Sequence, residues 1–103
     1  MKEFKKMKDF TNKHINANYR KGTQTYVGNL WFYVDGLEYK AKSVNSTINL
    51  GKIPYSEISS IKSVNTIGFI PNGIIIQLTN GKKFNYVIGD RKSVIKFIES
   101  KIK

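Results

Sequence analysis

The 103-residue sequence contains no cysteine and only one histidine, His14. Without cysteine, the chain forms no disulfide and supplies neither a thiol nucleophile nor a thiolate metal ligand. A single histidine cannot build a multi-histidine metal site. No apolar run approaches the roughly 20 residues that a membrane-spanning helix requires. No short apolar stretch with a small-residue cleavage site follows the start, so we expect no signal peptide.

Acidic residues are also scarce, because seven Asp and Glu oppose 18 Lys and Arg. No two of these acids stand in a motif that would hold them as an acid–base pair. No serine, histidine and acid form a recognisable catalytic unit, and no glycine-rich loop has the pattern that cradles phosphate. We therefore expect no enzyme activity, no cofactor and no bound metal.

The net charge of +11 is unevenly distributed along the chain. Residues 1–21 carry +5, whereas 22–89 and 90–103 carry +3 each. Such a field favours anionic partners, namely nucleic acid, acidic lipid or an acidic protein face. Lysine outnumbers arginine 16 to 2, which disfavours bidentate reading of phosphate or guanine. The same lysine excess, with abundant Ile and Asn, is also the usage of an AT-rich genome, so both interpretations stay open.

The length fits one domain, which buries roughly two thirds of its unfolded surface. A hydrophobic content of 40% and an aromatic content of 13% exclude general disorder. Turn signals divide the chain at Lys21-Gly22, Asp35-Gly36, Asn72-Gly73 and Asn80-Gly81. The alternation between them predicts seven strands, over residues 14–20, 24–34, 37–44, 48–53, 57–66, 73–78 and 82–88.

The hairpin around Asp35-Gly36 has alternating apolar residues on both arms, since these turn residues accept positive φ. A two-residue loop predicts the core-facing pairs Val34–Leu37, Phe32–Tyr39 and Leu30–Ala41. The hairpin around Asn80-Gly81 needs a different turn. A three-residue loop with Gly81 as a left-handed bulge places Ile76 opposite Phe84 and Ile74 opposite Tyr86, so that the apolar faces coincide.

The chain ends in a predicted amphipathic helix that follows Gly89 and a capping Asp90. Its apolar residues recur at helical spacing, and these are Val94, Ile95, Ile98 and Ile102. Lys101 and Lys103 lie at the negative end of its dipole. Seven strands and one C-terminal helix predict a mainly β domain, a curved sheet or partial barrel closed by the helix.

The first twelve residues have a different pattern from the rest. Their apolar residues Met1, Phe4, Met7 and Phe10 share one side of a helical wheel. Lysines 2, 5, 6 and 13 occupy the other side. We therefore predict a short, basic amphipathic helix over residues 1–12, preceding a domain over 13–103. Three alternatives are open for this segment: it packs on its own domain as a helix, it contacts a membrane or a partner as a helix, or it is disordered.

Two stretches resemble a known family. Gly28-Asn29-Leu30-Trp31-Phe32-Tyr33 with Gly36-Leu37-Glu38-Tyr39 resembles the Gly-x-Leu-x-Leu-Thr…Arg-Leu-x-Phe hairpin of GRAM and bacterial pleckstrin-homology-like domains. Ile53-Pro54-Tyr55-Ser56-Glu57-Ile58-Ser59-Ser60-Ile61 resembles their Ile-Pro-aromatic-Ser-acidic-Ile-x-x-Val segment. The resemblance spans residues 14–102 and implies a PH-like partial barrel of about seven antiparallel strands capped by an α-helix.

The resemblance also implies a non-catalytic module that binds lipid headgroups, peptides or other domains. The phosphoinositide site of eukaryotic relatives resembles a Lys-xₙ-Lys/Arg-x-Arg pattern at the first hairpin, where this chain has Lys13, Arg20 and Lys21. Thr23 follows Gly22 where the second arginine would stand, so we expect weak attachment by charge. The candidate anion-binding or lipid-binding residues are Lys2, Lys5, Lys6, Arg20, Lys21, Lys40 and Lys42; a solvated basic face is the alternative.

Outward-facing aromatic and apolar residues are candidate partner contacts. Trp31 and Tyr33 point away from the predicted core. Three roles are open for such a pair, namely stacking on bases, holding a membrane interface and anchoring a protein partner. Alternatively, Phe4, Met7 and Phe10 cover them. The loop 67–71, with Phe69 and Ile70, is unusually apolar. Three interpretations are open: the loop inserts into a membrane, it contacts a second subunit, or it extends the flanking strands.

The sequence therefore predicts a module that associates with an anionic surface, most simply the acidic lipid of the inner membrane face, from the cytoplasm. One alternative is a protein–protein interaction or oligomerisation module that uses Trp31 or an exposed strand edge. Another is an accessory nucleic-acid-binding protein, although no known reading motif is present. The sequence does not define the oligomeric state or the ligand.

Overall fold

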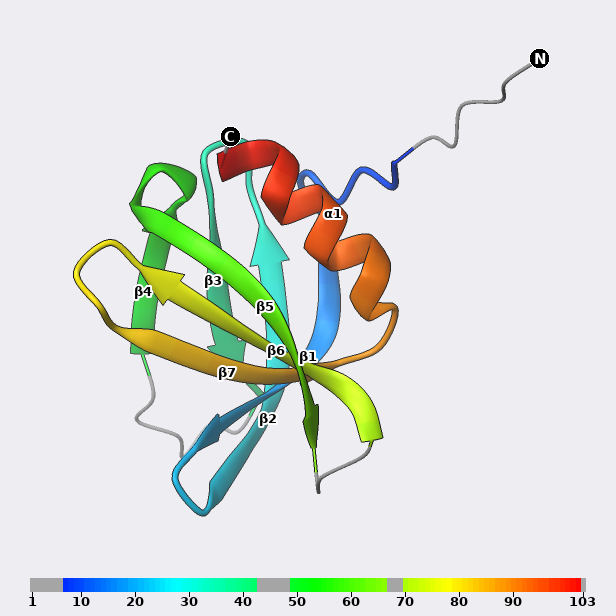
Figure 1. Cartoon of the computed structure of the whole chain (residues 1–103), viewed down its shortest axis with the longest axis vertical. Coiled ribbons are helices and arrows are strands. Elements are labelled where there is room, and N and C mark those ends of the chain that lie inside the picture. The colour runs from blue at the N-terminus through cyan, green and yellow to red at the C-terminus, as the bar shows by residue number, and fades with distance from the viewer. Residues whose placement is uncertain (1–6, 43–48, 67–69, 103) are drawn as a thin grey trace.

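The computed structural model of the chain describes residues 7–42, 49–66 and 70–102 (Figure 1). Its elements are β1 (His14–Lys21), β2 (Gln24–Phe32), β3 (Gly36–Ala41), β4 (Asn49–Pro54), the short 3₁₀ helix η1 (Tyr55–Glu57), β5 (Ile58–Thr66), β6 (Ile70–Leu78), β7 (Lys83–Ile88) and α1 (Arg91–Ile102). The seven predicted strands and the predicted C-terminal helix are confirmed, with boundaries that differ by a few residues.

The seven strands form one antiparallel sheet in the order β4-β3-β2-β1-β7-β6-β5. The sheet curls into a half-barrel, and α1 lies across one end of it (Figure 1), where it packs against β5 and β6. Strands β4 and β5 are the two edges of the sheet. The predicted mainly β architecture closed by a helix is confirmed.

The β6–β7 hairpin has the predicted register. Ile76 lies opposite Phe84 and Ile74 opposite Tyr86, and the Leu78 amide donates to the Lys82 carbonyl at 2.8 Å across a three-residue loop. Gly81 has φ +93°, a conformation that glycine adopts without steric cost. Burial of one face decides this register, because a shift by one residue would turn every isoleucine outward.

The predicted register of the β2–β3 hairpin is wrong by two residues. Phe32 pairs with Leu37 and Leu30 with Tyr39. The Tyr33 amide donates to the Gly36 carbonyl at 2.7 Å, so the turn residues are Val34 and Asp35. Val34 is therefore 70% exposed instead of lying in the core. The shift by an even number keeps the remaining side chains on their predicted faces.

The role of Gly36 explains this error. A Cβ atom on Gly36 would lie 2.4 Å from the carbonyl oxygen of Ile53 in the neighbouring strand, so glycine is required for close backbone approach. Gly36 has no positive φ, and the Asp-Gly pair is thus not the turn that its sequence suggests.

The core is rich in aromatic rings at both ends of the half-barrel. Near α1, the ring of Phe97 meets those of Phe10, Phe32 and Tyr55 at centroid distances of 5.5, 5.5 and 6.4 Å. Further along the strands, Tyr86 is fully buried and its ring lies 5.5 Å from Tyr19 and 5.6 Å from Tyr39. These contacts suit edge-to-face and tilted aromatic packing, which adds to the area buried.

The predicted N-terminal helix is wrong for the part that the structure describes. Residues 7–10 have no helical structure and 11–12 form a turn, while residues 1–6 lie outside the described chain. The Asn12 amide donates to the Phe32 carbonyl at 2.9 Å, and the Phe32 amide donates to the Lys13 carbonyl at 2.9 Å. These bonds hold the segment beside β2 and place Phe10, only 8% exposed, in the core.

Candidate anion-binding surface

Acidic and basic residues occupy different parts of the fold. Five neighbouring strands of the sheet contain no Asp or Glu, and these are β2, β1, β7, β6 and β5. The acids of the described residues are Asp9, Asp35, Glu38, Glu57, Asp90 and Glu99. They lie in the N-terminal segment, the β2–β3 turn, β3, η1 and α1 with the residue before it. In Figure 1, the N-terminal segment, the β2–β3 turn and η1 lie toward the helix-bearing end.

The ends of β1 and β3 carry cations without acids. Their basic residues are Arg20 and Lys21 at the end of β1 and Lys42 after β3. Arg20 lies between Thr25 of β2 and Asn85 of β7 in the register of the sheet. In the part of the chain that the structure describes, the ion pairs are Lys8–Asp90 and Lys52–Asp35, so these three cations have no carboxylate partner there. We call them the acid-free basic end. Lys82 and Lys83 do not belong to it, because the β6–β7 turn lies beside η1, where the Thr79 amide donates to the Glu57 carbonyl at 2.9 Å.

The structure divides the candidate lipid-binding residues. Arg20, Lys21 and Lys42 lie in the acid-free basic end, and Lys42 is tied to β2 because its amide donates to the Val27 carbonyl at 2.9 Å. Lys40 is exposed on the same outward face but opposite Asn29, which places it ~16 Å from Arg20 by strand spacing and rise. Lys13 precedes β1 and lies at the other end of that strand. Lys2, Lys5 and Lys6 lie outside the described residues.

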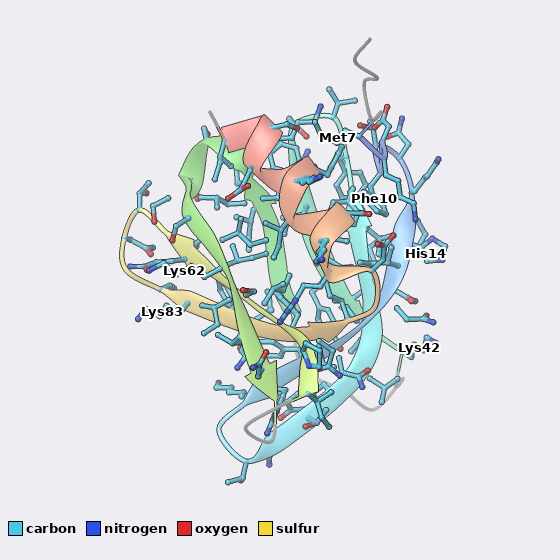
Figure 2. All side chains as sticks on the ribbon, turned by 45° about the vertical axis from the view of Figure 1, so that its right-hand side comes forward. Met7, Phe10, His14, Lys42, Lys62 and Lys83 are labelled. Atoms are coloured by element: carbon cyan, nitrogen blue, oxygen red, sulfur yellow. The ribbon has the colours of Figure 1, made fainter. Side chains whose placement is uncertain are left out.

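Two further basic residues on this face were not singled out in the sequence. Lys62 of β5 pairs with Ile75, and Lys83 of β7 pairs with Gln77, so both flank β6 on its outward side. Figure 2 shows them on the same side of the molecule. The predicted register of the β6–β7 hairpin was the signal that could have identified Lys83, because that register turns Lys83 outward.

Trp31 forms a small aromatic and cationic cluster on the outer face. It lies opposite His14 in the register, and the two rings stack with centroids 4.3 Å apart. The Lys40 ammonium lies 4.9 Å from the Trp31 ring centroid, within the range of a cation–π contact. Trp31 is thus half-buried by its own strand neighbours and keeps part of its ring exposed.

The proposed covering of Trp31 by N-terminal apolar residues is wrong for Phe10. Phe10 packs 5.4 Å from the Phe32 ring, on the inner side of the sheet, whereas His14 points outward (Figure 2). Met7 is 47% exposed. Phe4 lies outside the described residues.

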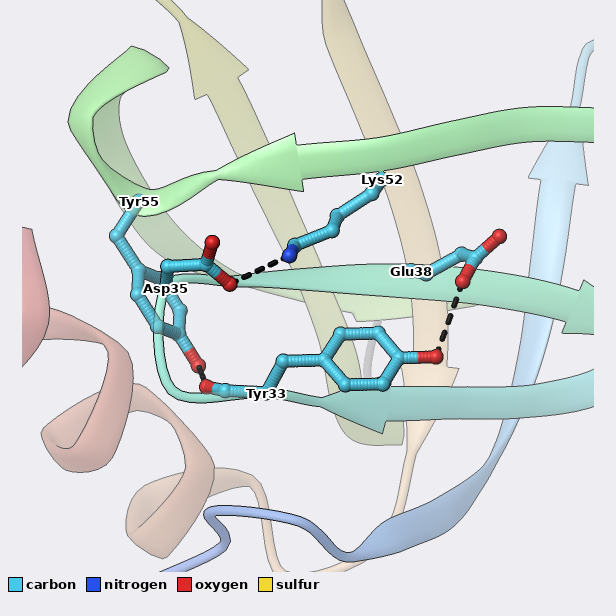
Figure 3. Close-up of polar contacts among 5 residues, drawn as sticks. All are labelled: Tyr33, Asp35, Glu38, Lys52 and Tyr55. Atoms are coloured by element: carbon cyan, nitrogen blue, oxygen red, sulfur yellow. Dashed lines mark hydrogen bonds and ion pairs between the residues drawn. The ribbon is translucent and has the colours of Figure 1, made fainter.

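Tyr33 takes part in a local network at the β2–β3 turn (Figure 3). Its hydroxyl donates to Glu38 Oε1 at 3.0 Å, and its carbonyl accepts a hydrogen bond from the Tyr55 hydroxyl at 3.1 Å. The Lys52 ammonium lies 5.3 Å from the Tyr33 ring centroid. The hydrogen bond from Lys52 lowers the pKa of the Asp35 carboxyl. Burial raises the pKa of Tyr55 to about 12. This arrangement gives Tyr33 a structural role in fixing the turn.

The apolar segment between β5 and β6 is described only at its two ends. Thr66 pairs with Ile70, so the flanking strands extend toward each other, as one of the three interpretations expects. Phe69 lies outside the described residues.

The structure offers little for catalysis in its described part. Among these residues, no three His, Asp or Glu side chains gather where they could hold a metal ion. A cleft of about 560 Å³ lies between the N-terminal segment, β1 and the start of α1, and its polar lining is Lys8, His14, Asn16 and Asp90. The hydrogen bond from Lys8 lowers the pKa of Asp90, so the two groups neutralise each other.

None of the described helices has the length and apolar content for crossing a membrane.

Comparison with known proteins supports the fold. No family model and no curated protein matches the chain. The chain is similar to the crystal structure of the C-terminal domain of an unknown protein from Leishmania infantum, with a TM-score of 0.74 and 15% identity over 87% of this chain and 81% of that one. It is also similar to the Slm1 PH domain in complex with D-myo-inositol-4-phosphate, with a TM-score of 0.59 and 13% identity over 90% of this chain and 97% of that one.

These similarities assign the chain to the pleckstrin-homology-like fold, a half-barrel of seven antiparallel strands with one C-terminal helix. Because both identities are low, they show the fold alone. The GRAM-like and bacterial assignment remains a prediction from the sequence.

Proposed function

We propose that the chain is a non-catalytic, PH-like binding module that associates with an anionic lipid surface through its acid-free basic end. The observation that carries this proposal is the separation of charge. Arg20, Lys21 and Lys42 lie at strand ends where the intervening strand β2 and the β1–β2 turn hold no acid, so no carboxylate of these elements competes with an external anion. The module would attach from the cytoplasm to the inner membrane face.

The chemistry of these residues favours attachment by charge over recognition of one headgroup. Two of the three are lysines, whose compact ammonium groups act as point charges and do not form the planar fork of arginine. Each basic residue near an anionic membrane contributes about 1 kcal/mol, so a few residues suffice for reversible binding. The inositol phosphate in the Slm1 complex shows that this fold can present an anion site, and the lysine composition supports a less selective one here.

Co-sedimentation with vesicles tests the proposal. Protein is mixed with neutral or anionic vesicles at low and near-physiological salt, with duplex DNA as competitor. We expect sedimentation only with anionic vesicles, weakening with salt. Sedimentation that DNA abolishes while the DNA complex itself persists at that salt would favour nucleic acid as the partner. No sedimentation at either salt would contradict the proposal.

Paired charge variants locate the surface. Lys21→Gln with Lys42→Gln removes two charges from the acid-free basic end, and both side chains are exposed. At about 1 kcal/mol per residue, vesicle binding should weaken about tenfold or more. Lys92→Gln with Lys96→Gln on α1 removes the same charge elsewhere and should have a much smaller effect. Equal losses in the two variants would show that net charge, and not this surface, determines binding.

A further inference from the structure

A second candidate surface lies between the sheet edge β5 and α1. A groove of about 350 Å³ is lined by Ser63 of β5 and by Arg91, Lys92, Ile95, Lys96 and Glu99 of α1. It is remote in the fold from the acid-free basic end and involves none of its three cations. The elements on either side are visible in Figure 1, where α1 crosses near β5.

One wall of the groove is an open strand. β5 is the last strand of the sheet and pairs only with β6 among the described strands. In an antiparallel edge strand, alternate backbone N–H and C=O groups point away from the neighbouring strand. Ser63 lies opposite the fully buried Ile74 but is itself exposed. Its small side chain therefore leaves space between the strand edge and the helix.

The other wall is a single stripe of α1. Residues 91, 92, 95, 96 and 99 follow the spacing that places side chains on one helix face. From Arg91 to Glu99 the helix rises ~12 Å, which an extended peptide spans with about four residues. The groove therefore has the length of a short added strand. Ile95, partly buried against the core, supplies an apolar floor.

The charges of this groove favour an acidic occupant. Arg91, Lys92 and Lys96 are opposed in the groove by Glu99 alone. Arg91 Nη1 donates to the Val64 carbonyl at 2.9 Å, which fixes its guanidinium group at the β5 side. In the described part of the chain, none of these cations makes an ion pair with a carboxylate. Lys62 adds a further exposed cation on the outward side of β5.

We infer that the groove binds an extended acidic segment of a partner protein, which adds to β5 as an eighth strand. The strand edge would supply main-chain hydrogen bonds, Ile95 would meet an apolar side chain, and Lys92 and Lys96 would face carboxylates. The inference does not depend on the proposed membrane association, because the two surfaces share no residue.

Defined peptides test this inference. The probes are capped seven-residue peptides in which valine alternates with glutamate, in both phases, so that either set of side chains can face the groove. One control replaces glutamate with lysine, and another carries N-methyl groups on alternate residues, which removes hydrogen-bond donors along one edge. Binding is followed by the shifts of backbone amide NMR signals and by amide hydrogen exchange.

A glutamate peptide is expected to shift signals of β5 and the groove face of α1 and to slow exchange of β5 amides. The lysine peptide should not bind, and the N-methyl peptide should bind at least fivefold more weakly. Lys92→Gln with Lys96→Gln should weaken binding of the glutamate peptide about tenfold, as expected for two exposed charge contacts. Lys21→Gln with Lys42→Gln should leave that binding within about twofold.

Three results would overturn the inference. These are no binding of either glutamate peptide, equal binding of the lysine peptide, and binding without slower exchange in β5. The reciprocal variants separate the two proposals, because the Lys92 and Lys96 pair should impair peptide binding and the Lys21 and Lys42 pair should impair vesicle binding. Loss of one activity with retention of the other shows which proposal has failed.

Discussion

Phe10 and Phe97 meet edge to face, with ring centroids 5.5 Å apart and an interplanar angle of 74°. Phe10 comes from the segment before β1 and Phe97 from the middle of α1, so this pair joins the two ends of the described chain. Both rings also contact Phe32 at the end of β2. The N-terminal segment is therefore part of the core that seats the helix.

Replacing Phe10 should destabilise the fold. Phe10→Ala removes a buried ring that contacts two others, and core Phe→Ala substitutions cost about 3–5 kcal/mol. We expect a loss of about 3 kcal/mol in the free energy of unfolding, measured by chemical denaturation. Met7→Ala, at a 47% exposed position of the same segment, should change it by less than about 0.5 kcal/mol. A small effect of Phe10→Ala would show that the segment is not seated in the core.

Gly36 should tolerate no side chain. In Gly36→Ala the new Cβ would lie 2.4 Å from the Ile53 carbonyl oxygen, and the β3 and β4 backbones would have to separate. Overpacking of this kind costs about 1–3 kcal/mol. Gly89→Ala is the matched control, because its Cβ would meet nothing within 4 Å. Thermal or denaturant unfolding of the two variants should differ clearly, and equal stabilities would refute the requirement for close approach at Gly36.

His14, and not the N-terminal segment, should control the environment of Trp31. Trp31 is the single tryptophan, so fluorescence reports on it alone. His14→Ala removes the ring stacked 4.3 Å away and should shift the emission to longer wavelength. Phe10→Ala, measured where the variant is still folded, should leave the emission unchanged. The opposite result would restore the hypothesis that the N-terminal apolar residues cover Trp31.

Alkaline pH should destabilise the fold through buried tyrosines. Burial raises the pKa of Tyr55 to about 12 and also raises the pKa of Tyr86, whereas an unfolded tyrosine titrates near 10. The folded state then holds its phenolic protons where the unfolded state releases them, so stability is intact below about pH 10 and falls as pH rises toward 12. Denaturation curves across this range should show the fall.

Tyr55→Phe provides the control for this pH dependence. The variant cannot ionise at position 55, so its stability should fall less steeply between pH 10 and 12 than that of the parent chain. An absorbance titration of tyrosinate should also lose one late-ionising group. Identical pH dependence in the two proteins would contradict the raised pKa of Tyr55.

The register of the β6–β7 hairpin was predictable because only one loop length makes Ile74 and Ile76 share a face with Phe84 and Tyr86. The same reasoning located the β2–β3 faces but not the register, since two registers that differ by two residues bury the same side. Local sequence did not show that Gly36 is reserved for the approach of Ile53.

The candidate surfaces could not be located from the sequence, because each is formed by residues that are far apart in the chain and meet only in the fold. The spacing of Met7 and Phe10 fits a helix, but the burial of Phe10 beneath α1 depends on residues more than eighty positions away. Segment charges gave no sign of the acid-free basic end, because Lys42 is held beside Val27, and Val27 opposite Asn18 near the end of β1, only when the three strands pair. The groove at β5 likewise required the strand order.

Pairing of β1 with β7 also has a consequence for how quickly the chain folds. It joins residues 65 to 71 positions apart, from Arg20–Asn85 to Ala17–Ile88, whereas the other strand pairs are between neighbours in sequence. The entropy cost of closing one long loop therefore falls on a short ladder of four residue pairs. We expect this ladder to limit the folding rate, so that substitutions at Ala17 or Ile88 slow folding more than they speed unfolding.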